Sequence, residues 1–457
     1  MLKRVLVANR GEIAVRIIRA CRDKGIETVA VYSTADANSL HTQLATTAVC
    51  IGKAPASESY LNANAIIAVA LATKCDSLHP GYGFLSENSD FARMCEKHSI
   101  KFIGPSADII DNMGNKSMAR EMMIKASVPV VPGSDGVITS LEQAYSVAEK
   151  IGYPVLIKAS AGGGGRGMRK VFHKEELETL LSTAKAEAMS CFGDDSMYME
   201  KLIINPKHIE FQILADTYGN VIHLGERDCS LQRRGQKMME ESPSISLSPE
   251  LRQRMGEDAV KAARTVGYIG AGTIEFVVDS KGNYFFIEMN TRIQVEHPVT
   301  EMRTGMDLIY EQLRIAAGLP ISNLNVEFSG HVIECRINSE DPTLDFRPSS
   351  GEISFIHFPG GYNTRIESAM YPGCTVSPFY DSMIAKIIVK GDTRLEAIRR
   401  MRRALEEMVV EGVATNASLQ HLIMHDKDII KGTYDTGFIE NKLSGILNIY
   451  ETVRGKQ

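Results

Sequence analysis

The sequence lacks the cysteine spacings of a zinc site or a disulfide scaffold. Its eight cysteines are scattered over 457 residues and never occur as C-x-x-C, the spacing that zinc ribbons and redox motifs use. A scattered set of this kind is typical of proteins from a reducing compartment. We therefore expect free thiols and a cytoplasmic location.

Long apolar runs and an excess of positive charge are also missing. No window approaches the roughly 18 apolar residues of a membrane span. The apolar stretch Val5–Ala8 is too short for a signal peptide and is predicted to be a strand. With 51 basic and 56 acidic residues, the net charge is −5, which gives no bulk attraction for a polyanion. We therefore expect neither a membrane nor a nucleic acid as a partner.

Two common nucleotide-binding signatures are absent. The turn Asn9-Arg10-Gly11-Glu12 follows the first predicted strand but lacks G-x-G-x-x-G, which argues against a dinucleotide oxidoreductase. The glycine run 162–165 leads into a predicted strand, Met168–Phe172, and no Lys-Ser/Thr pair follows it. It is therefore neither a dinucleotide loop, which must open a helix, nor a Walker A loop.

The length predicts roughly three domains, and the patterns differ along the chain. The first region starts with a strand, a helix over Ile13–Lys24 and a strand over Thr28–Tyr32, which predicts a parallel sheet. From about residue 206 the pattern becomes antiparallel. We expect a mixed α/β and α+β fold with domains at 1–114, 115–330 and 331–446.

A small unit at residues 130–202 carries the glycine run between two predicted strands, so the run is expected at a hairpin tip. Glycines leave backbone N–H groups bare, as an anion requires. Lys158 on the strand before them would add a positive charge. The segment is predicted to be a phosphate-binding flap; a flexible surface loop is the alternative.

Every second residue from Glu288 to Glu296 is polar, and the residues between them are less polar or apolar. A period of two sends these sets to opposite faces of a strand or other extended segment. The polar set is Glu288, Asn290, Arg292, Gln294 and Glu296. It forms either the solvated side of a half-exposed strand or a site.

A predicted hairpin places a second carboxylate opposite this stripe. If its two-residue loop is Lys281-Gly282, Glu275 pairs with Glu288 and their Cβ atoms lie about 5 Å apart. Two facing carboxylates need a proton or a cation, and with Asn290 they suit Mg²⁺ or Mn²⁺. A four-residue loop would shift this register and separate the pair. By contrast, the highly charged run 226–237 has the ordinary composition of a solvated loop.

Several long segments together resemble the biotin carboxylase family of the ATP-grasp superfamily. The resemblance extends from residue 1 to about 445. It rests on five segments: Ala8–Ala14, His79–Asn88, Lys158–Gly167, Glu226–Arg234 and Phe286–Thr300. It implies an ATP-grasp fold with a βαβ N-terminal domain, a mobile lid at 130–202 and a mixed or antiparallel C-terminal domain.

The resemblance also implies a reaction. ATP would phosphorylate bicarbonate to carboxyphosphate, which breaks down to CO₂ and phosphate, and the ureido nitrogen of biotin would then be carboxylated. Two Mg²⁺ or Mn²⁺ ions would neutralise phosphate charge. Since no biotinylated lysine is expected in this chain, a biotin carboxyl carrier protein would act in trans, with carboxyltransferase subunits, in the acetyl-CoA carboxylase of fatty acid synthesis.

The family pattern assigns roles to individual residues. Glu275, Glu288 and Asn290 match metal ligands, and Glu296 matches the general base. Arg292, Gln294 and the backbone of Val295 would hold bicarbonate near Lys237, while Arg336 would stabilise the biotin enolate. The nucleotide and biotin positions are Lys116, Lys158, Gly163, Gly164, Gly165, Glu200, Lys201, Ile203, His208, Gln232 and, near biotin, Tyr82.

Two features separate this chain from the usual pattern. Gly235 stands where the family usually has His, so either ATP binding is weaker or another residue compensates for the missing donor. The hairpin between Glu275 and Glu288 is also one residue longer than in some relatives.

The resemblance also concerns assembly. Arg16, Arg19 and Arg365 match positions near a homodimer interface.

The sequence also allows two alternative functional interpretations. The chain could be the biotin carboxylase subunit of a pyruvate, propionyl-CoA or other acyl-CoA carboxylase, because the chemistry is shared. A non-catalytic nucleotide-binding regulator is disfavoured by the intact set of site residues named above.

Overall fold

The computed structural model describes residues 2–160 and 167–454. The N-terminal region is a five-stranded parallel sheet in the order β3-β2-β1-β4-β5. Its strands are β1 (Arg4–Val7), β2 (Glu27–Ser33), β3 (Thr47–Gly52), β4 (Ser77–His79) and β5 (Lys101–Phe102). The helices of this region are α1 (Gly11–Asp23), α2 (Leu40–Leu44), α3 (Ala63–Ala72), α4 (Ser89–Lys97) and α5 (Ala107–Gly114), with short turns η1 (Thr34–Asp36) and η2 (Ala56–Glu58).

The predicted βαβ start is confirmed. β1 pairs with β2 in parallel, with Arg4 opposite Glu27. Ile13, Ile17 and Ile18 lie on α1 at helical spacing and are buried, as an amphipathic helix packed on a sheet requires.

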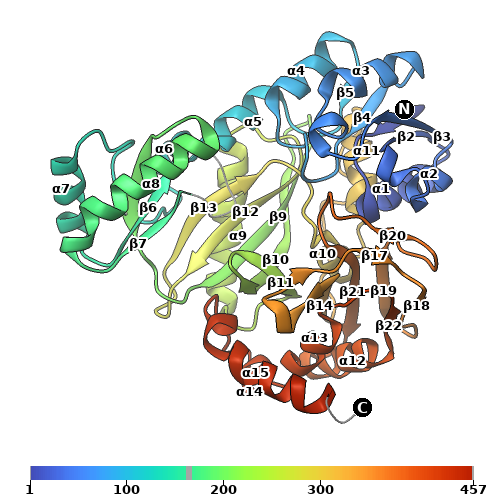
Figure 1. The fold of residues 1–457 in the computed structure, drawn as a ribbon. Coiled ribbons are helices and arrows are strands. Elements are labelled where there is room, and N and C mark those ends of the chain that lie inside the picture. The colour runs from blue at the N-terminus through green and yellow to red at the C-terminus, as the bar shows by residue number, and fades with distance from the viewer. Residues whose placement is uncertain (1, 161–166, 455–457) are drawn as a thin grey trace.

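A smaller unit protrudes on the left of Figure 1 and lies within residues 130–202, the range expected to form a lid. The helix α6 (Lys116–Lys125) precedes this unit, and its Ala119 and Met123 are buried in the apolar cluster of the central region. The elements of the unit are α7 (Leu141–Ile151), β6 (Val155–Ala159), β7 (Arg169–Val171), η3 (Lys174–Glu176), α8 (Leu177–Phe192) and β8 (Met197–Lys201). β6 pairs antiparallel with both β7 and β8, so the predicted hairpin arrangement of β6 and β7 is confirmed. The predicted flap glycines Gly163, Gly164 and Gly165 lie outside the described residues.

An eight-stranded antiparallel sheet forms the centre, in the order β13-β12-β9-β10-β11-β14-β21-β19. Its strands are β9 (Lys207–Ala215), β10 (Val221–Arg233), β11 (Gln236–Ser242), β12 (Gly270–Val278), β13 (Tyr284–Asn290), β14 (His331–Asn338), β19 (Thr364–Ser368) and β21 (Met383–Gly391). Antiparallel pairing of β11 with β14 joins the second and third predicted regions into one sheet.

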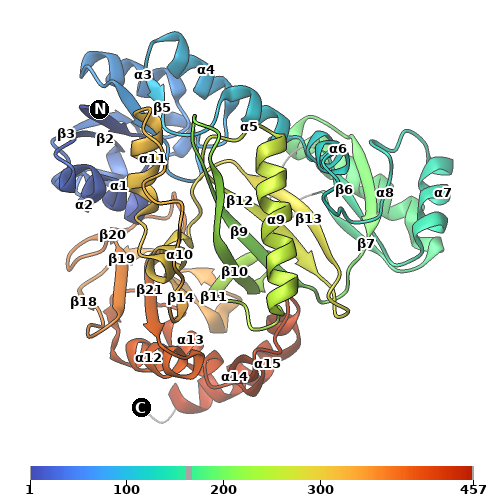
Figure 2. The ribbon, with the colours of Figure 1, turned by 180° about the vertical axis from the view of Figure 1, so that it is seen from behind.

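The two faces of this sheet differ in chemistry. Phe211 on β9 and Phe276 on β12 are buried in one apolar cluster with Met255 of α9 (Pro249–Thr265). Figure 2 shows α9 lying along these strands from behind. Because side chains alternate along a strand, the residues between the apolar ones point to the other face. That face carries the polar side chains of the candidate site.

The hairpin register between β12 and β13 is as predicted at one pair, although the predicted loop is wrong. Glu275 lies opposite Glu288. The loop is not the two residues Lys281-Gly282: the N–H of Asp279 donates to the carbonyl of Asn283, which leaves three residues between them. An irregularity after Glu275 shifts the register by one residue, as a β-bulge does. The bulge compensates for the longer loop.

The charged run 226–237 is not a solvated loop, so that expectation is wrong. Most of it belongs to β10, and the side chains of Glu226, Arg227 and Asp228 are buried. Arg227 donates to Glu210 and Gln212 of β9 and to Thr300. Buried charge is retained here because it is paired and hydrogen-bonded.

The C-terminal region covers the lower end of the sheet in Figure 1. The helices α10 (His297–Thr304) and α11 (Leu308–Ala316) precede this region, and α11 contacts β12 and α1. The helices of the C-terminal region are α12 (Arg394–Glu407), α13 (Ala417–Ile423), α14 (Lys427–Lys431) and α15 (Phe438–Arg454). Its short elements are β15 (Glu340–Asp341), η4 (Pro342–Leu344), β16 (Arg347–Pro348), β17 (Gly351–Glu352), β18 (Phe355–His357), β20 (Thr375–Val376) and β22 (Val409–Glu411).

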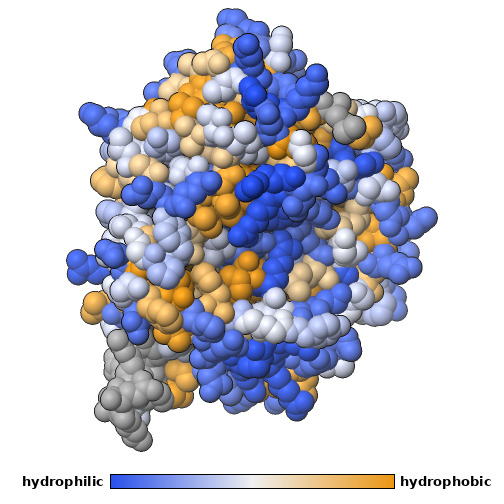
Figure 3. All heavy atoms as spheres, turned by 90° about the vertical axis from the view of Figure 1, so that its right-hand side faces the viewer, coloured by the Kyte–Doolittle hydropathy of each residue, from blue (hydrophilic) through white to orange (hydrophobic). Residues whose placement is uncertain are grey.

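The surface agrees with the composition of the chain. On the face shown in Figure 3, hydrophobic side chains form separate patches among hydrophilic ones. Of the helices in the described part of the chain, none combines the length and apolar character needed to cross a membrane. All eight cysteines are free thiols, as predicted.

Candidate active site

The centre of the site is a partly buried lysine among three carboxylates. The ammonium of Lys237, on β11, donates to Glu210 at 2.6 Å, to Glu296 at 2.6 Å and to Glu275 at 3.2 Å. Burial alone would lower the pKa of Lys237, but the three carboxylates raise it well above its ordinary value. Lys237 is therefore a permanent cation that holds three strands and the segment before α10 together.

The polar stripe continues this cluster. β13 ends at Asn290, so only the start of the stripe is a strand. Beyond it, Arg292 donates to the side-chain oxygens of Asn290 at 3.0 Å and Gln294 at 2.9 Å. The amides of Asn290 and Gln294 both donate to Oε1 of Glu275. From Asn290 to Glu296 the polar residues of the stripe thus belong to one hydrogen-bonded network, so the solvated-strand alternative is wrong for this part.

Glu296 is fully buried and held at both oxygens. Its Oε1 accepts from Lys237 and its Oε2 from Nη2 of Arg336, 2.9 Å away. Burial would raise the pKa of Glu296, but Lys237, Arg336 and Arg227 lower it well below its ordinary value. At neutral pH this group is a carboxylate, the form that can accept a proton.

Arg336, on β14, has a second carboxylate partner that the sequence did not reveal. Its Nε donates to Glu240 of β11 at 2.6 Å. Burial raises the pKa of Glu240 to about 7, against the opposing effect of Arg336. The guanidinium therefore lies between a firmly ionised carboxylate, Glu296, and one that titrates near neutrality.

The three residues predicted as metal ligands, Glu275, Glu288 and Asn290, lie together and offer oxygen atoms as ligands. Glu275 and Glu288 face each other across β12 and β13, and Asn290 bonds to Glu275. Burial would raise the pKa of Glu275, but Lys237 and His208 lower it well below the ordinary value. Within the described chain, the one recorded partner of Glu288 is Lys116, at 3.7 Å, so its oxygens have lone pairs to spare. This set fits a hard divalent cation.

A second group of possible ligands is already neutralised by the protein. Glu210, Cys229 and Glu296 lie close enough to share an ion. The cations of Lys237 and Arg227 already contact these carboxylates. No additional metal is needed to explain this group.

The lid contributes the other predicted nucleotide residues. Lys158, on β6, donates to Glu200 of β8 at 2.6 Å; burial would lower the pKa of Lys158, but Glu200 raises it. Lys201 is the next residue on β8, so its side chain takes the opposite direction and donates to the carbonyls of Gly152 and Tyr153. Ile203 follows β8 and is partly buried.

The remaining predicted positions lie at the edges of the cluster. Nε2 of His208, on β9, is 2.8 Å from Glu275. Burial would lower the pKa of His208, but Glu275 raises it. Gln232 pairs with Lys237 at the end of β10. The hydroxyl of Tyr82 donates to Glu12 of α1, so this contact connects the loop that carries Tyr82 to α1.

Several residues of this network were not identified from the sequence. Glu210, Glu240 and Glu87 are examples; Glu87 accepts from Nε of Arg292 at 2.9 Å. For Glu210 a signal existed, because His208, Glu210 and Gln212 alternate with apolar residues along β9 and share one face. Glu87 and Glu240 meet their partners only through the tertiary fold.

The residues predicted near a dimer interface make contacts within the chain. Arg16 donates to Glu301 at 2.9 Å and to Asp307 at 2.5 Å. Arg365 lies 2.8 Å from Glu301. Arg19 is exposed on α1.

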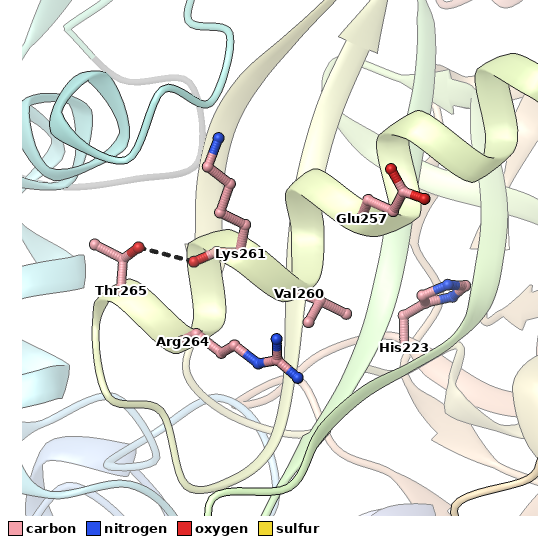
Figure 4. Close-up of a pocket in the computed structure, with 6 residues that line it drawn as sticks. All are labelled: His223, Glu257, Val260, Lys261, Arg264 and Thr265. Carbon is pink, nitrogen blue, oxygen red and sulfur yellow. Dashed lines mark hydrogen bonds between the residues drawn. The ribbon is translucent and has the colours of Figure 1, made fainter.

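A surface hollow lies away from this network. It measures about 360 Å³ and lies on α9 beside His223 of β10. Figure 4 shows its six lining residues: His223, Glu257, Val260, Lys261, Arg264 and Thr265. Because α9 packs on the apolar face of the sheet, this hollow and the polar network lie on opposite faces.

Comparisons with known families cover nearly the whole chain. Residues 1–110 match "Biotin carboxylase, N-terminal domain", residues 115–324 match "Carbamoyl-phosphate synthase L chain, ATP binding domain", and residues 334–441 match "Biotin carboxylase C-terminal domain".

Individual relatives are similar over the same length. Biotin carboxylase 1 of Bacillus subtilis is 55% identical over 443 residues, which cover 96% of this chain and 98% of that protein.

Two solved structures share the fold. The biotin carboxylase–β,γ-ATP complex from Campylobacter jejuni has a TM-score of 0.95 at 48% identity, covering 96% of this chain and 99% of that one. The biotin carboxylase domain dimer of Hydrogenobacter thermophilus 2-oxoglutarate carboxylase, in complex with MgADP, ADP and bicarbonate, has a TM-score of 0.94 at 52% identity, covering 97% and 98%.

Proposed function

The chain belongs to the biotin carboxylase family and catalyses ATP-dependent carboxylation of biotin, and we propose that it supplies the first half-reaction of an acetyl-CoA carboxylase. In this reaction the γ-phosphoryl group of ATP passes to bicarbonate and ADP leaves. Carboxyphosphate then yields CO₂ and phosphate; the released phosphate takes the proton of the ureido nitrogen of biotin, and this nitrogen bonds to CO₂.

The observation that carries the assignment of roles is the position of Glu296. Its carboxylate lies between Lys237 and Arg336. In the proposal, Glu296 accepts the proton of bicarbonate, while Arg292, Gln294 and the backbone N–H of Val295 hold the anion. The cations that keep Glu296 ionised also stabilise the dianion that forms when bicarbonate loses its proton.

Arg336 is proposed to bind the ureido oxygen of biotin when negative charge develops there. A guanidinium keeps its charge at any working pH and is preorganised for oxygen acceptors. Its contact with Glu240 supports the role, because this contact fixes the guanidinium plane. Tyr82 is assigned to the biotin side of the site.

Glu275, Glu288 and Asn290 would hold Mg²⁺ or Mn²⁺ together with ATP. When bound, such ions neutralise charge on the phosphates during transfer. Lys116 and Lys158, with the glycines at 163–165, are proposed to bind the phosphates. Glu200, Lys201 and Ile203 are proposed to meet the adenine, and His208 and Gln232 the ribose.

The domain division at 1–114, 115–330 and 331–446, with a lid at 130–202, is part of the proposal. The three family matches support it, since their limits lie close to these boundaries. The separate three-stranded sheet of β6, β7 and β8 supports a lid that moves as a unit.

The partners are also proposed. A biotin carboxyl carrier protein would present biotin in trans, and carboxyltransferase subunits would use the product. A homodimer is supported by the dimeric Hydrogenobacter domain, with Arg19 exposed on the face expected at the interface. A cytoplasmic location is consistent with the eight free thiols.

One alternative has a specific observation in its favour. The 52% identity to the 2-oxoglutarate carboxylase domain is nearly the same as the 55% identity to the Bacillus protein. The chain could therefore serve a 2-oxoacid carboxylase with the same half-reaction.

Carrier selectivity tests the choice. The rate of carboxylation would be measured on biotinylated carrier domains from an acetyl-CoA carboxylase and from a 2-oxoacid carboxylase. The proposal predicts a higher kcat/KM on the acetyl-CoA carboxylase carrier. A higher kcat/KM on the other carrier would reverse the assignment.

A further inference from the structure

Two buried side chains that carry no role in the proposed chemistry bind the backbone on either side of Val295. The Nδ1 atom of His297 lies 2.8 Å from the carbonyl oxygen of Gln294. The Nζ atom of Lys386 lies 2.7 Å from the carbonyl oxygen of Val295. Both side chains are buried.

Each contact fixes a different peptide group. The carbonyl of Gln294 belongs to the same planar unit as the N–H of Val295, and the carbonyl of Val295 to the same unit as the N–H of Glu296. His297 therefore fixes the direction of the Val295 N–H. Lys386 fixes the plane of the peptide group between Val295 and Glu296.

The tautomer of His297 follows from its partner. A carbonyl oxygen only accepts, so Nδ1 must carry the hydrogen. Burial first, then Lys386, Arg16 and Arg365, lower the pKa of His297 well below its ordinary value, so the ring is neutral. Its Nε2 has no hydrogen-bond partner within the described chain. The donor bond to Gln294 is thus the one polar contact that its ring makes there.

Lys386 also connects this backbone to the loop that carries Tyr82. It lies on β21 directly opposite Arg336 of β14, and its Nζ is 3.0 Å from Oε1 of Glu12. The hydroxyl of Tyr82 donates to the same oxygen. One chain of contacts therefore links Tyr82, Glu12, Lys386 and Val295.

We propose that His297 and Lys386 are positioning residues that clamp the two peptide groups around Val295 and so preorganise the bicarbonate cradle and the base Glu296. The inference rests on the proposed function of this segment. An unrestrained segment outside helices and strands samples many peptide orientations, and a misplacement near 1 Å can cost about 100-fold in rate. Two fixed planes remove that freedom before the substrate arrives.

The first test compares two nearly isosteric replacements of His297. In His297→Asn the amide can replace the Nδ1 donor, whereas His297→Leu removes it. The expected result is a bicarbonate KM close to that of the parent for His297→Asn and about tenfold higher for His297→Leu, with the ATP KM unchanged in both. Equal bicarbonate KM values for the two variants, at equal Tm, would overturn the role of His297.

The second test uses a lysine on the same strand as a matched control. Lys390, also on β21, donates to the carbonyl of Met302 on α10 and to Ser329, away from the site. Lys386→Met should raise the bicarbonate KM by about tenfold or more and speed amide hydrogen exchange in residues 292–297, whereas Lys390→Met should do neither. If the two variants match in both measurements, the clamp is disproved.

These outcomes are separable from failure of the proposed function. If the parent protein hydrolyses no ATP in response to bicarbonate, the proposed function fails. The exchange measurement still tests the clamp, because it reads backbone order without any substrate. An exchange rate unchanged by Lys386→Met would then reject the clamp on its own.

Discussion

Arg336 and Glu296 form an ion pair across the polar face of the central sheet, with Nη2 of the arginine 2.9 Å from Oε2 of the glutamate. The pair joins β14 to the segment that precedes α10. It places the residue assigned to the biotin enolate in contact with the base assigned to bicarbonate. The two halves of the reaction therefore share one charged contact.

Replacing Arg336 should separate biotin chemistry from nucleotide binding. In Arg336→Ala the donor for the developing oxyanion is lost, so carboxybiotin formation should fall by roughly 100-fold to 1000-fold. The KM for MgATP should change little, because Arg336 does not touch Glu275, Glu288 or Asn290. Steady-state kinetics with biotin and with ATP measure both quantities; parallel loss in the two would contradict the assignment.

Reversing the charge at Glu288 should remove metal-dependent activity. Glu288→Lys puts an ammonium where a cation is expected, beside Lys116, so bicarbonate-dependent ATP hydrolysis should be lost at every Mg²⁺ concentration. Glu257→Lys is the matched control, since Glu257 is an exposed acid on α9. Activity of Glu288→Lys that is restored by more Mg²⁺ would point to general electrostatics instead of a ligand.

Gly235 offers a test of the unusual turn between β10 and β11. Arg234 and Gly235 form the tip, both with positive φ, +50° and +81°. A β-carbon at Gly235 would meet no atom within 4 Å, so Gly235→His fits in space but costs about 1 kcal/mol of stability through the backbone. We expect a lower ATP KM together with a lower Tm. An unchanged ATP KM would show that position 235 has no part in nucleotide binding.

A buried histidine should make the fold sensitive to acid. Nδ1 of His79 accepts from the N–H of Gly81, and Nε2 lies 3.2 Å from Oε1 of Gln312. Burial lowers the pKa of His79 to about 3. The unfolded chain takes up a proton below about pH 6.5 and the folded chain does not, so stability is present above that pH and is lost as pH falls.

Below about pH 6.5, His79 should lower the free energy of unfolding by roughly 1 kcal/mol for each pH unit of acidification. The free energy of unfolding would be measured at pH 7.5 and pH 5.5 in the parent, in His79→Asn and in His98→Asn, where His98 is exposed. The decrease in the free energy of unfolding from pH 7.5 to pH 5.5 should be smaller in His79→Asn than in the parent, whereas His98→Asn should match the parent. An equal loss in all three proteins would mean that His79 does not couple folding to protons.

Local sequence patterns predicted much of the site because they are expressed within single strands and hairpins. The alternation after Glu288 could be predicted from the pleat of a single strand, and the register of Glu275 from one hairpin turn. The register was correct although the loop is longer than predicted, because a bulge after Glu275 restored the pairing. A bulge leaves no distinct mark in the sequence.

Other parts depend on contacts between distant segments. The charges at 226–228 are typical of a loop, yet they are buried because β9 and α10 bring their partners to them. Glu87 and Arg292 are 205 residues apart in sequence. Lys386 meets Val295 only because β11 and β14 join the second and third regions in one sheet. The periodicity of the sequence gives no information about such contacts between distant segments.

The most direct test of the central claim measures carboxybiotin formed from labelled bicarbonate, ATP, Mg²⁺ and free biotin. The parent protein should form it, with ATP hydrolysis that requires bicarbonate, and Glu296→Gln should lower the rate by about 100-fold to 10,000-fold with little change in ATP KM. Formation of carboxybiotin by Glu296→Gln at the parent rate would contradict the role of Glu296. Absence of carboxybiotin with the parent protein would contradict the function itself.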